Sequence, residues 1–255
     1  IRLSSPKNIS NNTGYDNQPS FYNDNLVVFA STRNEQTDIA GFAINRSSVS
    51  WITDTPNGSE YSPLKIPGKK SVSAIRLDTD GTQRLYAYDL ESGTPKLLLK
   101  DLKVGYHVWF NNEIIVSSVL VENRMDLFVS NLKKHSNYKI YKNVGRSFHK
   151  IPNSKRISFI GKQSSTPELL SLDPLSGEIE KIIELPEGVQ DVCWMINGTV
   201  LAGHKNSILK FTPGTDTQWH VLFEISPTIL TNITRLATNS ISTKLAIVGE
   251  VSITD

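Results

Sequence analysis

The sequence is short of cysteine, of long apolar runs and of net charge, and each shortage excludes a class of protein. Its single cysteine, Cys193, has no internal disulfide partner, and the apolar run Val192–Met195 around it predicts a buried structural thiol. No segment approaches the roughly 18 apolar residues of a membrane helix, so no transmembrane segment is expected. With 27 basic and 25 acidic residues, the chain has no field of one sign that would attract nucleic acid.

The rest of the composition is compatible with more than one compartment. Scarce cysteine suits exported bacterial proteins as well as cytosolic ones. The chain begins at Ile1 without a methionine or a signal-peptide pattern, so we expect a mature protein or a trimmed piece of one. A chain of 255 residues buries enough surface to fold without a disulfide or a metal, so stability alone requires no cofactor.

A repeat of just over 40 residues determines the predicted fold. In Gln18–Ile52, four short apolar or alternating segments are separated by turns rich in Asn, Asp and Ser. Such segments predict strands and cannot form the stripe of an amphipathic helix. The same order recurs along the chain, and four strands per repeat of this length are typical of β-propeller blades. Equivalent positions lie 41 to 45 residues apart, at Pro19, Pro63, Val108, His149 and Val192.

We therefore predict one all-β domain over residues 1–255, a six-bladed β-propeller of four-stranded antiparallel blades. The expected blades span residues 17–55, 60–100, 105–142, 145–185, 188–224 and 230–255, the last closed by residues 1–10.

The closing blade is expected to be shared by the two ends of the chain. Ile233–Leu236 and Lys244–Val248 repeat only the first two strands of a blade, while Ile1–Pro6 parallels the fourth strand of the first copy. Sharing would remove two free sheet edges that otherwise invite aggregation. The third strand comes either from Val251–Ile253 or from outside this chain.

Short motifs recur at the same places in the copies. Ala30–Arg33 ends a second strand with Ser-x-Arg, and Arg84–Tyr88 precedes the turn Asp89–Gly93. In Asp126–Ser130, an acidic residue is followed by an aliphatic and then by an aromatic residue. These motifs resemble the TolB-like propeller repeat over nearly the whole chain. The resemblance is strong in the first two copies and weak in the fifth, where Ser207 stands at the acidic position.

The resemblance implies an exported bacterial protein, periplasmic or extracellular, that docks a partner protein or peptide. Such a protein could also be part of a larger envelope assembly. Related propellers cap prolyl oligopeptidase-like peptidases, but these residues contain no Gly-x-Ser-x-Gly nucleophile elbow.

Loops that enter the innermost strand of each blade gather around one mouth of a propeller's central channel, where their side chains can converge on a ligand. Here these loops carry aromatic rings, histidines, an arginine and carboxylates, which suit a peptide or a carbohydrate. The candidate funnel residues are Tyr15, Asp16, Gln18, Glu60, Tyr61, Tyr106, His107, Arg146, Phe148, His149, Gln190 and Asp191.

An enzyme is the alternative interpretation. His107 and His149 could combine with Asp16, Glu60 or Asp191 to hold a divalent metal, as a metal-assisted lyase, lactonase or other hydrolase acting on a carbohydrate-like substrate would require. The sequence contains no closely spaced His or Cys pair and no complete calcium loop. We therefore predict a non-catalytic scaffold that binds a protein or peptide, with no cofactor, no metal and no nucleic acid.

Overall fold

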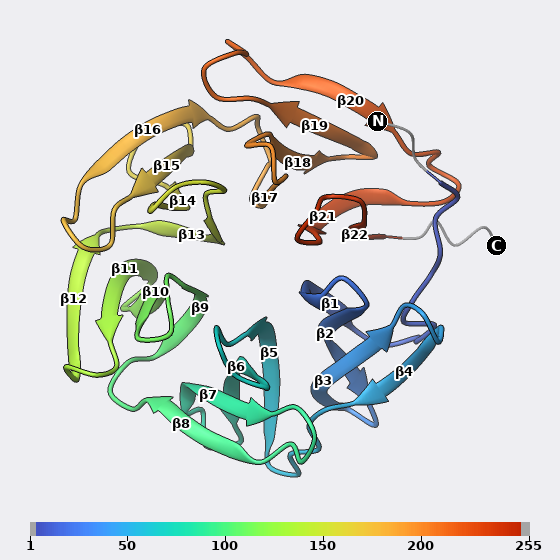
Figure 1. The fold of residues 1–255 in the computed structure, drawn as a ribbon, viewed down its shortest axis with the longest axis vertical. Coiled ribbons are helices and arrows are strands. Elements are labelled where there is room, and N and C mark those ends of the chain that lie inside the picture. The colour runs from blue at the N-terminus through green and yellow to red at the C-terminus, as the bar shows by residue number, and fades with distance from the viewer. Residues whose placement is uncertain (1–3, 251–255) are drawn as a thin grey trace.

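A computed structural model describes residues 4–250, which form a ring of antiparallel sheets around a centre (Figure 1). Within these residues there are five four-stranded sheets and one two-stranded sheet. Each four-stranded sheet uses four consecutive strands in chain order, so every connection is a short hairpin. In the same part of the chain, no helix is long and apolar enough to cross a membrane. The all-β propeller prediction is confirmed.

In each four-stranded sheet, the first strand lies nearest the centre of the ring and the fourth lies at its periphery (Figure 1). The first blade holds β1 (Asp16–Asn23), β2 (Leu26–Arg33), β3 (Gln36–Ala43) and β4 (Ser48–Trp51); the second β5 (Gly58–Lys65), β6 (Ser71–Asp78), β7 (Gln83–Asp89) and β8 (Pro95–Leu99); the third β9 (Val104–Trp109), β10 (Ile114–Val121), β11 (Arg124–Asn131) and β12 (Ser136–Tyr141); the fourth β13 (Val144–Lys150), β14 (Ile157–Gly161), β15 (Glu168–Leu172) and β16 (Ile179–Glu184); the fifth β17 (Val192–Trp194), β18 (Val200–His204), β19 (Ser207–Phe211) and β20 (His220–Glu224). The two-stranded sheet pairs β21 (Thr231–Thr238) with β22 (Leu245–Glu250).

The prediction of six complete blades is wrong for the described residues. β21 and β22 are the expected first two strands of the closing blade, but no third or fourth strand joins them within residues 4–250. Ser4–Tyr15 forms no strand, and Lys7 and Ile9 instead contact the first blade. The predicted contributions of residues 1–3 and of Val251–Ile253 lie outside the described residues.

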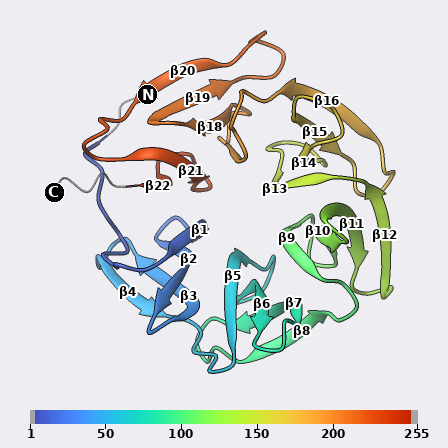
Figure 2. The ribbon, with the colours of Figure 1, turned by 180° about the vertical axis from the view of Figure 1, so that it is seen from behind.

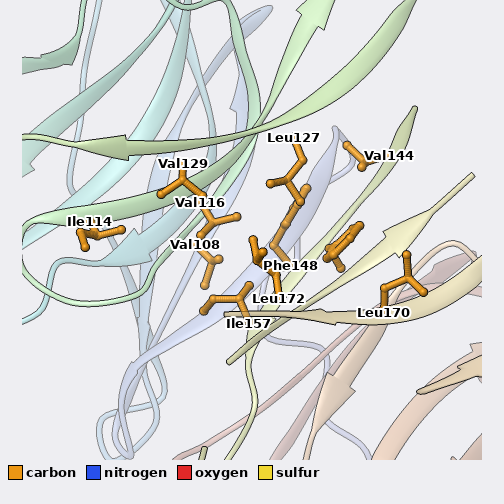
Figure 3. Close-up of a cluster of buried hydrophobic side chains, with 11 residues drawn as sticks. Val108, Ile114, Val116, Leu127, Val129, Val144, Phe148, Ile157, Leu170 and Leu172 are labelled. Atoms are coloured by element: carbon orange, nitrogen blue, oxygen red, sulfur yellow. The ribbon is translucent and has the colours of Figure 1, made fainter. Parts of the chain in front are cut away.

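Apolar packing between neighbouring sheets forms the core. The described residues contain six buried clusters, and five of them join consecutive sheets from the first to the last. Figure 3 shows one of them, in which Phe148 and Ile157 of the fourth blade meet Val108 and Val116 of the third. The outermost strands β4, β8, β12, β16 and β20 are largely exposed, because they lie at the periphery. Cys193 is buried between β17–β20 and β21–β22, as predicted.

Two indoles reinforce these seams in the same way. Trp109 and Trp194 each donate a hydrogen bond of 2.8 Å from Nε1 to a serine Oγ in the preceding blade. The acceptors are Ser73 and Ser158, and both lie 36 residues before the tryptophan. A repeated polar contact inside an apolar seam fixes how one blade is placed on the next.

The seam that closes the ring is built differently. From the last sheet, Ala246 packs against the small cluster around Phe29 and Phe42 in the first blade. The Asp24 carboxylate, in the turn between β1 and β2, accepts hydrogen bonds from Asn239 Nδ2 at 2.8 Å and Ser240 Oγ at 2.9 Å. These two bonds lower the pKa of Asp24. Within residues 4–250, the contacts that close the ring are therefore made by side chains, and no strand is shared.

The seam between the first and second blades encloses a carboxylic acid. Glu60 on β5 is fully buried, and Tyr88 Oη donates to its Oε1 at 3.0 Å. The Thr53 hydroxyl lies 3.2 Å from Glu60 Oε2 and 3.4 Å from Oδ1 of the buried Asp38. Burial, with a smaller contribution from Asp38, raises the pKa of Glu60 to about 7. The first two blades thus share a carboxyl group that is partly protonated near neutral pH.

Glu60 predicts a specific pH dependence of stability. Its pKa is about 7 in the folded protein against 4.5 for an ordinary glutamate, so the folded state binds the proton more tightly. The contribution of Glu60 to the free energy of unfolding should be fully present below pH 4.5 and fall by about 3 kcal/mol as the pH rises through 7. Glu60→Gln should lack this fall, and urea unfolding of both proteins between pH 4.5 and 8 would measure the difference.

The comparison with Glu60→Gln isolates this residue because all other groups titrate in both proteins. His107, whose burial lowers its pKa to about 3, contributes the opposite trend in each, namely stability that is lost as the pH falls below its ordinary value of 6.5. Parallel stability profiles of wild type and Glu60→Gln would show that the carboxyl group is not protonated in the seam.

The closing seam predicts a local opening. Asp24→Ala removes the acceptor of both hydrogen bonds from the last sheet, so amide hydrogen exchange in β21 and β22 should accelerate relative to the other strands. Asp80→Ala is the matched control, since Asp80 accepts only from Thr82 within its own hairpin turn. Equal acceleration in all blades, or the same effect from Asp80→Ala, would contradict a closing role for Asp24.

Candidate functional site

The centre of the ring contains a cavity of about 70 Å³, and its lining residues come from all five blades and from the two-stranded sheet. The innermost strands β1, β5, β9, β13, β17 and β21 face one another around this centre, as the views from both sides show (Figure 1 and Figure 2). The lining residues are Gln18, Pro19, Ser62, Pro63, Leu64, Tyr106, His107, Arg146, Ser147, Phe148, His149, Asp191, Arg235 and Leu236. The cavity is therefore formed jointly by segments that are far apart in the sequence.

The backbone is irregular within two of the innermost strands where they line the cavity. The β1–β2 pairing shifts register between Asn17 and Ser20, and the β5–β6 pairing shifts between Tyr61 and Leu64. Gln18 and Ser62 lie within these shifts at φ angles of 56° and 54°, in the left-handed region that side chains rarely adopt. The Ser62 N–H donates to Gln18 Oε1 at 2.7 Å, which joins the two irregular segments across the seam.

An ionic cluster occupies one side of the cavity. Asp191 Oδ2 lies 2.7 Å from Arg235 Nη1 and 3.3 Å from Arg146 Nε, so one carboxylate serves two guanidinium groups. The Asp191 and Arg235 side chains are only 8% and 11% exposed, whereas Arg146 is 27% exposed. Arg146 Nη2 also donates to the carbonyl oxygen of Thr234 at 2.9 Å. The cluster carries one net positive charge in a largely enclosed place.

Three tyrosines stand beside this cluster. The Tyr106 ring lies 5.3 Å from the Arg235 guanidinium carbon, a cation–π distance. Tyr15 and Tyr61 meet edge to face with their ring centroids 6.3 Å apart. Burial raises the pKa of Tyr15, and the positive charges of Arg235 and Arg146 only partly oppose this change. The Tyr15 hydroxyl is therefore a neutral hydrogen-bond donor at neutral pH.

The two histidines of the cavity wall are neutral. His107 is buried, and its Nε2 lies 2.6 Å from Ser73 Oγ, the same oxygen that accepts from Trp109. Burial lowers the pKa of His107 to about 3, and burial also lowers the pKa of His149. His107 thus belongs to a structural hydrogen-bond network and adds no charge to the cavity.

The structure brings together most of the candidate funnel residues. Gln18, Tyr106, His107, Arg146, Phe148, His149 and Asp191 line the cavity, and Tyr15 and Tyr61 lie next to it. Three others are placed elsewhere: Asp16 accepts from Ser31 Oγ at 2.6 Å, Glu60 is enclosed between the first two blades, and Gln190 is exposed and is not part of the wall.

Sequence reasoning missed Arg235, which lies closest to Asp191 in the cluster. A signal was present, because Arg235 falls in the repeated segment Ile233–Leu236 that predicts the innermost strand of the closing blade. The candidate residues all lie at the entry loops of the first five copies, whereas Arg235 lies in the sixth copy.

The metal set considered from the sequence is not assembled. Among residues 4–250, no three His, Cys, Asp or Glu side chains lie close enough to share an ion. Glu60 points into the seam between blades, and Asp16 is bonded to Ser31 and Asn12.

A shallow groove of about 620 Å³ adjoins the cavity. Its walls come from the second, third and fourth blades, at Gln83, Gly105, Tyr106, Leu120, Glu122, Asn123, Arg124, Met125, Asn143, Val144 and Lys162. Tyr106 lines both hollows, so they lie against the same residue of the third blade.

Comparison with known proteins finds likeness in structure but not in sequence. No family model and no curated protein sequence matches the chain. A putative TolB from Agrobacterium tumefaciens superimposes with a TM-score of 0.69 at 11% identity, covering 85% of this chain and 83% of that one. TolB from Acinetobacter baumannii superimposes with a TM-score of 0.65 at 13% identity, covering 81% of this chain and 53% of its own, so this chain spans about half its length.

Enzymes share the same architecture. A gluconolactonase from Xanthomonas campestris superimposes with a TM-score of 0.71 at 10% identity, covering 94% of this chain and 85% of that one. Binding proteins and enzymes are thus similar to this chain to nearly the same degree, at identities that reflect fold rather than activity. Together these likenesses show that the chain has the β-propeller fold of TolB-like proteins and related propellers.

Proposed function

We propose that this protein is a non-catalytic scaffold that docks an extended peptide segment of a partner protein at the mouth of its central channel. The observation that carries the proposal is the position of Tyr106, which lines both the central cavity and the adjoining groove. Two hollows beside one tyrosine fit an elongated ligand, with one side chain inserted at the centre and the flanking residues lying across the third blade.

The size of the cavity supports a peptide over a small-molecule substrate. Sites that enclose whole small molecules measure about 300–1,000 Å³. The central cavity of about 70 Å³ has room for one side-chain group, and the larger groove is open to solvent. Tyr15, Tyr61 and Tyr106 supply rigid aromatic contact area of the kind that dominates protein recognition.

The chemistry of the wall also favours binding over catalysis. The His107 ring is held by Ser73 inside the wall, and both residues are buried, so neither is placed to attack a substrate. The pKa of His107 is far below neutrality and leaves it poorly suited to exchange protons near pH 7. We place the protein in the bacterial envelope, periplasmic or extracellular, on the basis of its TolB-like motifs and the TolB folds similar to it.

Replacement of the shared tyrosine should weaken docking. A random dodecapeptide library displayed on phage would be selected on the wild-type protein, and the enriched peptides would be synthesised. Their affinity for Tyr106→Ala and Tyr61→Ala should fall by about tenfold, the effect typical of aromatic anchors at interfaces. Fluorescence anisotropy with labelled peptides would measure the affinities, and circular dichroism would verify the folds.

Tyr138→Ala is the matched control, because Tyr138 is 62% exposed on the outer strand β12. It should bind the peptides as the wild type does. Failure to enrich any peptide, or peptides that bind Tyr106→Ala unchanged, would overturn the docking proposal. Turnover of a lactone or oligouronide by the wild-type protein would instead support the enzyme interpretation.

A further inference from the structure

The ionic cluster of the cavity has more cationic groups than it can satisfy internally. Of the described residues that line the cavity, Asp191 is the one acid, against Arg146 and Arg235. Within that part of the chain, the two guanidiniums make one hydrogen bond, to the Thr234 carbonyl, and two ion pairs, both to the same Asp191 oxygen. Each guanidinium carries five N–H donors, so most of the donors remain unused.

The excess of positive charge matters because the cluster is largely buried. Buried charges in proteins are ordinarily paired, because removing an unpaired charge from water is costly. Arg235 is 11% exposed, and its Nε is buried with no hydrogen-bond partner in the described residues. Two cations held around one anion in a confined space therefore form a site with a preference for a second anion.

The exposed edge of the cluster faces the place where a ligand would enter. Arg146 is 27% exposed and lines the cavity, so it can be reached from the mouth. The Tyr106 ring lies over the Arg235 guanidinium and restricts its plane, which favours the fork-like contact that arginine makes with carboxylates. The neutral Tyr15 hydroxyl lies close enough to both arginines for their charges to affect its pKa.

The volume limits what the anion can be. The cavity of about 70 Å³ is far smaller than the roughly 300–1,000 Å³ of sites that enclose whole small molecules, and a carboxylate is among the smallest anionic groups that a ligand can offer. The rest of any ligand must lie outside the cavity, as a peptide lying in the adjoining groove would do.

We propose that Arg146 and Arg235 form a carboxylate-binding site that selects an acidic peptide, by capturing an Asp or Glu side chain or a C-terminal carboxylate. This inference rests on the proposed docking function and names the group that is recognised. Asp191 is the internal counter-ion: it holds the two guanidiniums in place and competes with the incoming carboxylate.

Nuclear magnetic resonance of the wild-type protein tests the site with acetate as the probe. The Nε–H resonances of Arg146 and Arg235 should shift in a saturable way with sodium acetate, at ionic strength held constant with sodium chloride. Acetamide, which has the same shape without the charge, should not shift them. Equal responses to acetate and acetamide, or to acetate and chloride, would overturn the carboxylate site.

Three variants separate recognition from structure. Arg146→Gln should weaken acetate binding by about tenfold, because it removes a charged donor from the cluster. Asp191→Asn should strengthen it by about threefold, because it removes the competing negative charge, and no purely structural role predicts a gain. Arg46→Gln, at an exposed turn between β3 and β4, is the control and should bind acetate as the wild type does. Unchanged affinity in Arg146→Gln and Asp191→Asn would refute the assignment.

Peptides distinguish the source of the carboxylate and separate this inference from the docking function. Selected peptides would be compared with versions carrying Glu→Gln or Asp→Asn changes and with C-terminally amidated versions. Loss of binding in one set identifies a side chain or the terminus as the captured group. Peptides that bind equally well without any carboxylate would leave docking intact and refute the carboxylate site, whereas acetate binding without any enriched peptide would refute docking alone.

Discussion

Packing between neighbouring sheets is the interaction on which the rest of the structure depends. A four-stranded blade has two apolar faces and cannot bury either without a neighbour. Each buried cluster from the first blade to the last sheet therefore lies between two sheets, and two of the seams contain the same tryptophan–serine hydrogen bond. Trp109 and Trp194 lie at equivalent places in two different seams, so the same hydrogen bond to a serine of the preceding blade recurs in the ring.

This constraint also explains why a site forms at the centre. Because the sheets must face one another around a ring, the innermost strands converge, and residues separated by 88 or more positions, such as Arg146 and Thr234, come into hydrogen-bond contact. The converging ends cannot all be apolar, since they border solvent at the mouth. A mixture of tyrosines, arginines and one aspartate satisfies both conditions, with the aromatic bodies packed and the polar groups directed to the cavity.

The sequence was sufficient to predict the strands, the repeat and the order of the blades, because alternation and turn residues are local signals. It was also sufficient to find half of the residues that line the cavity, since entry loops occur at a nearly constant spacing. The sequence did not predict the surroundings of individual side chains: Glu60 is fully buried between the first two blades, whereas its neighbour Tyr61 is partly buried and meets Tyr15 edge to face. Ser62, within the register shift beside Tyr61, donates its N–H to Gln18, which lies 44 residues before Ser62, and a contact over this separation cannot be recognised from sequence alone.

The closing of the ring shows how far repetition can be extrapolated. The sixth copy was expected to reproduce a full blade, yet its described part contains two strands, and the small cluster beside it receives only Ala246 from that sheet. A seam with little apolar packing must rely more on polar contacts, and Asp24 with its two donors supplies them there. Arg235, the cation that pairs most closely with Asp191, stands on this same sheet. The geometry of the cavity is therefore coupled to the closure of the ring, so a ligand that bridges Arg146 and Arg235 would also hold the last sheet in place.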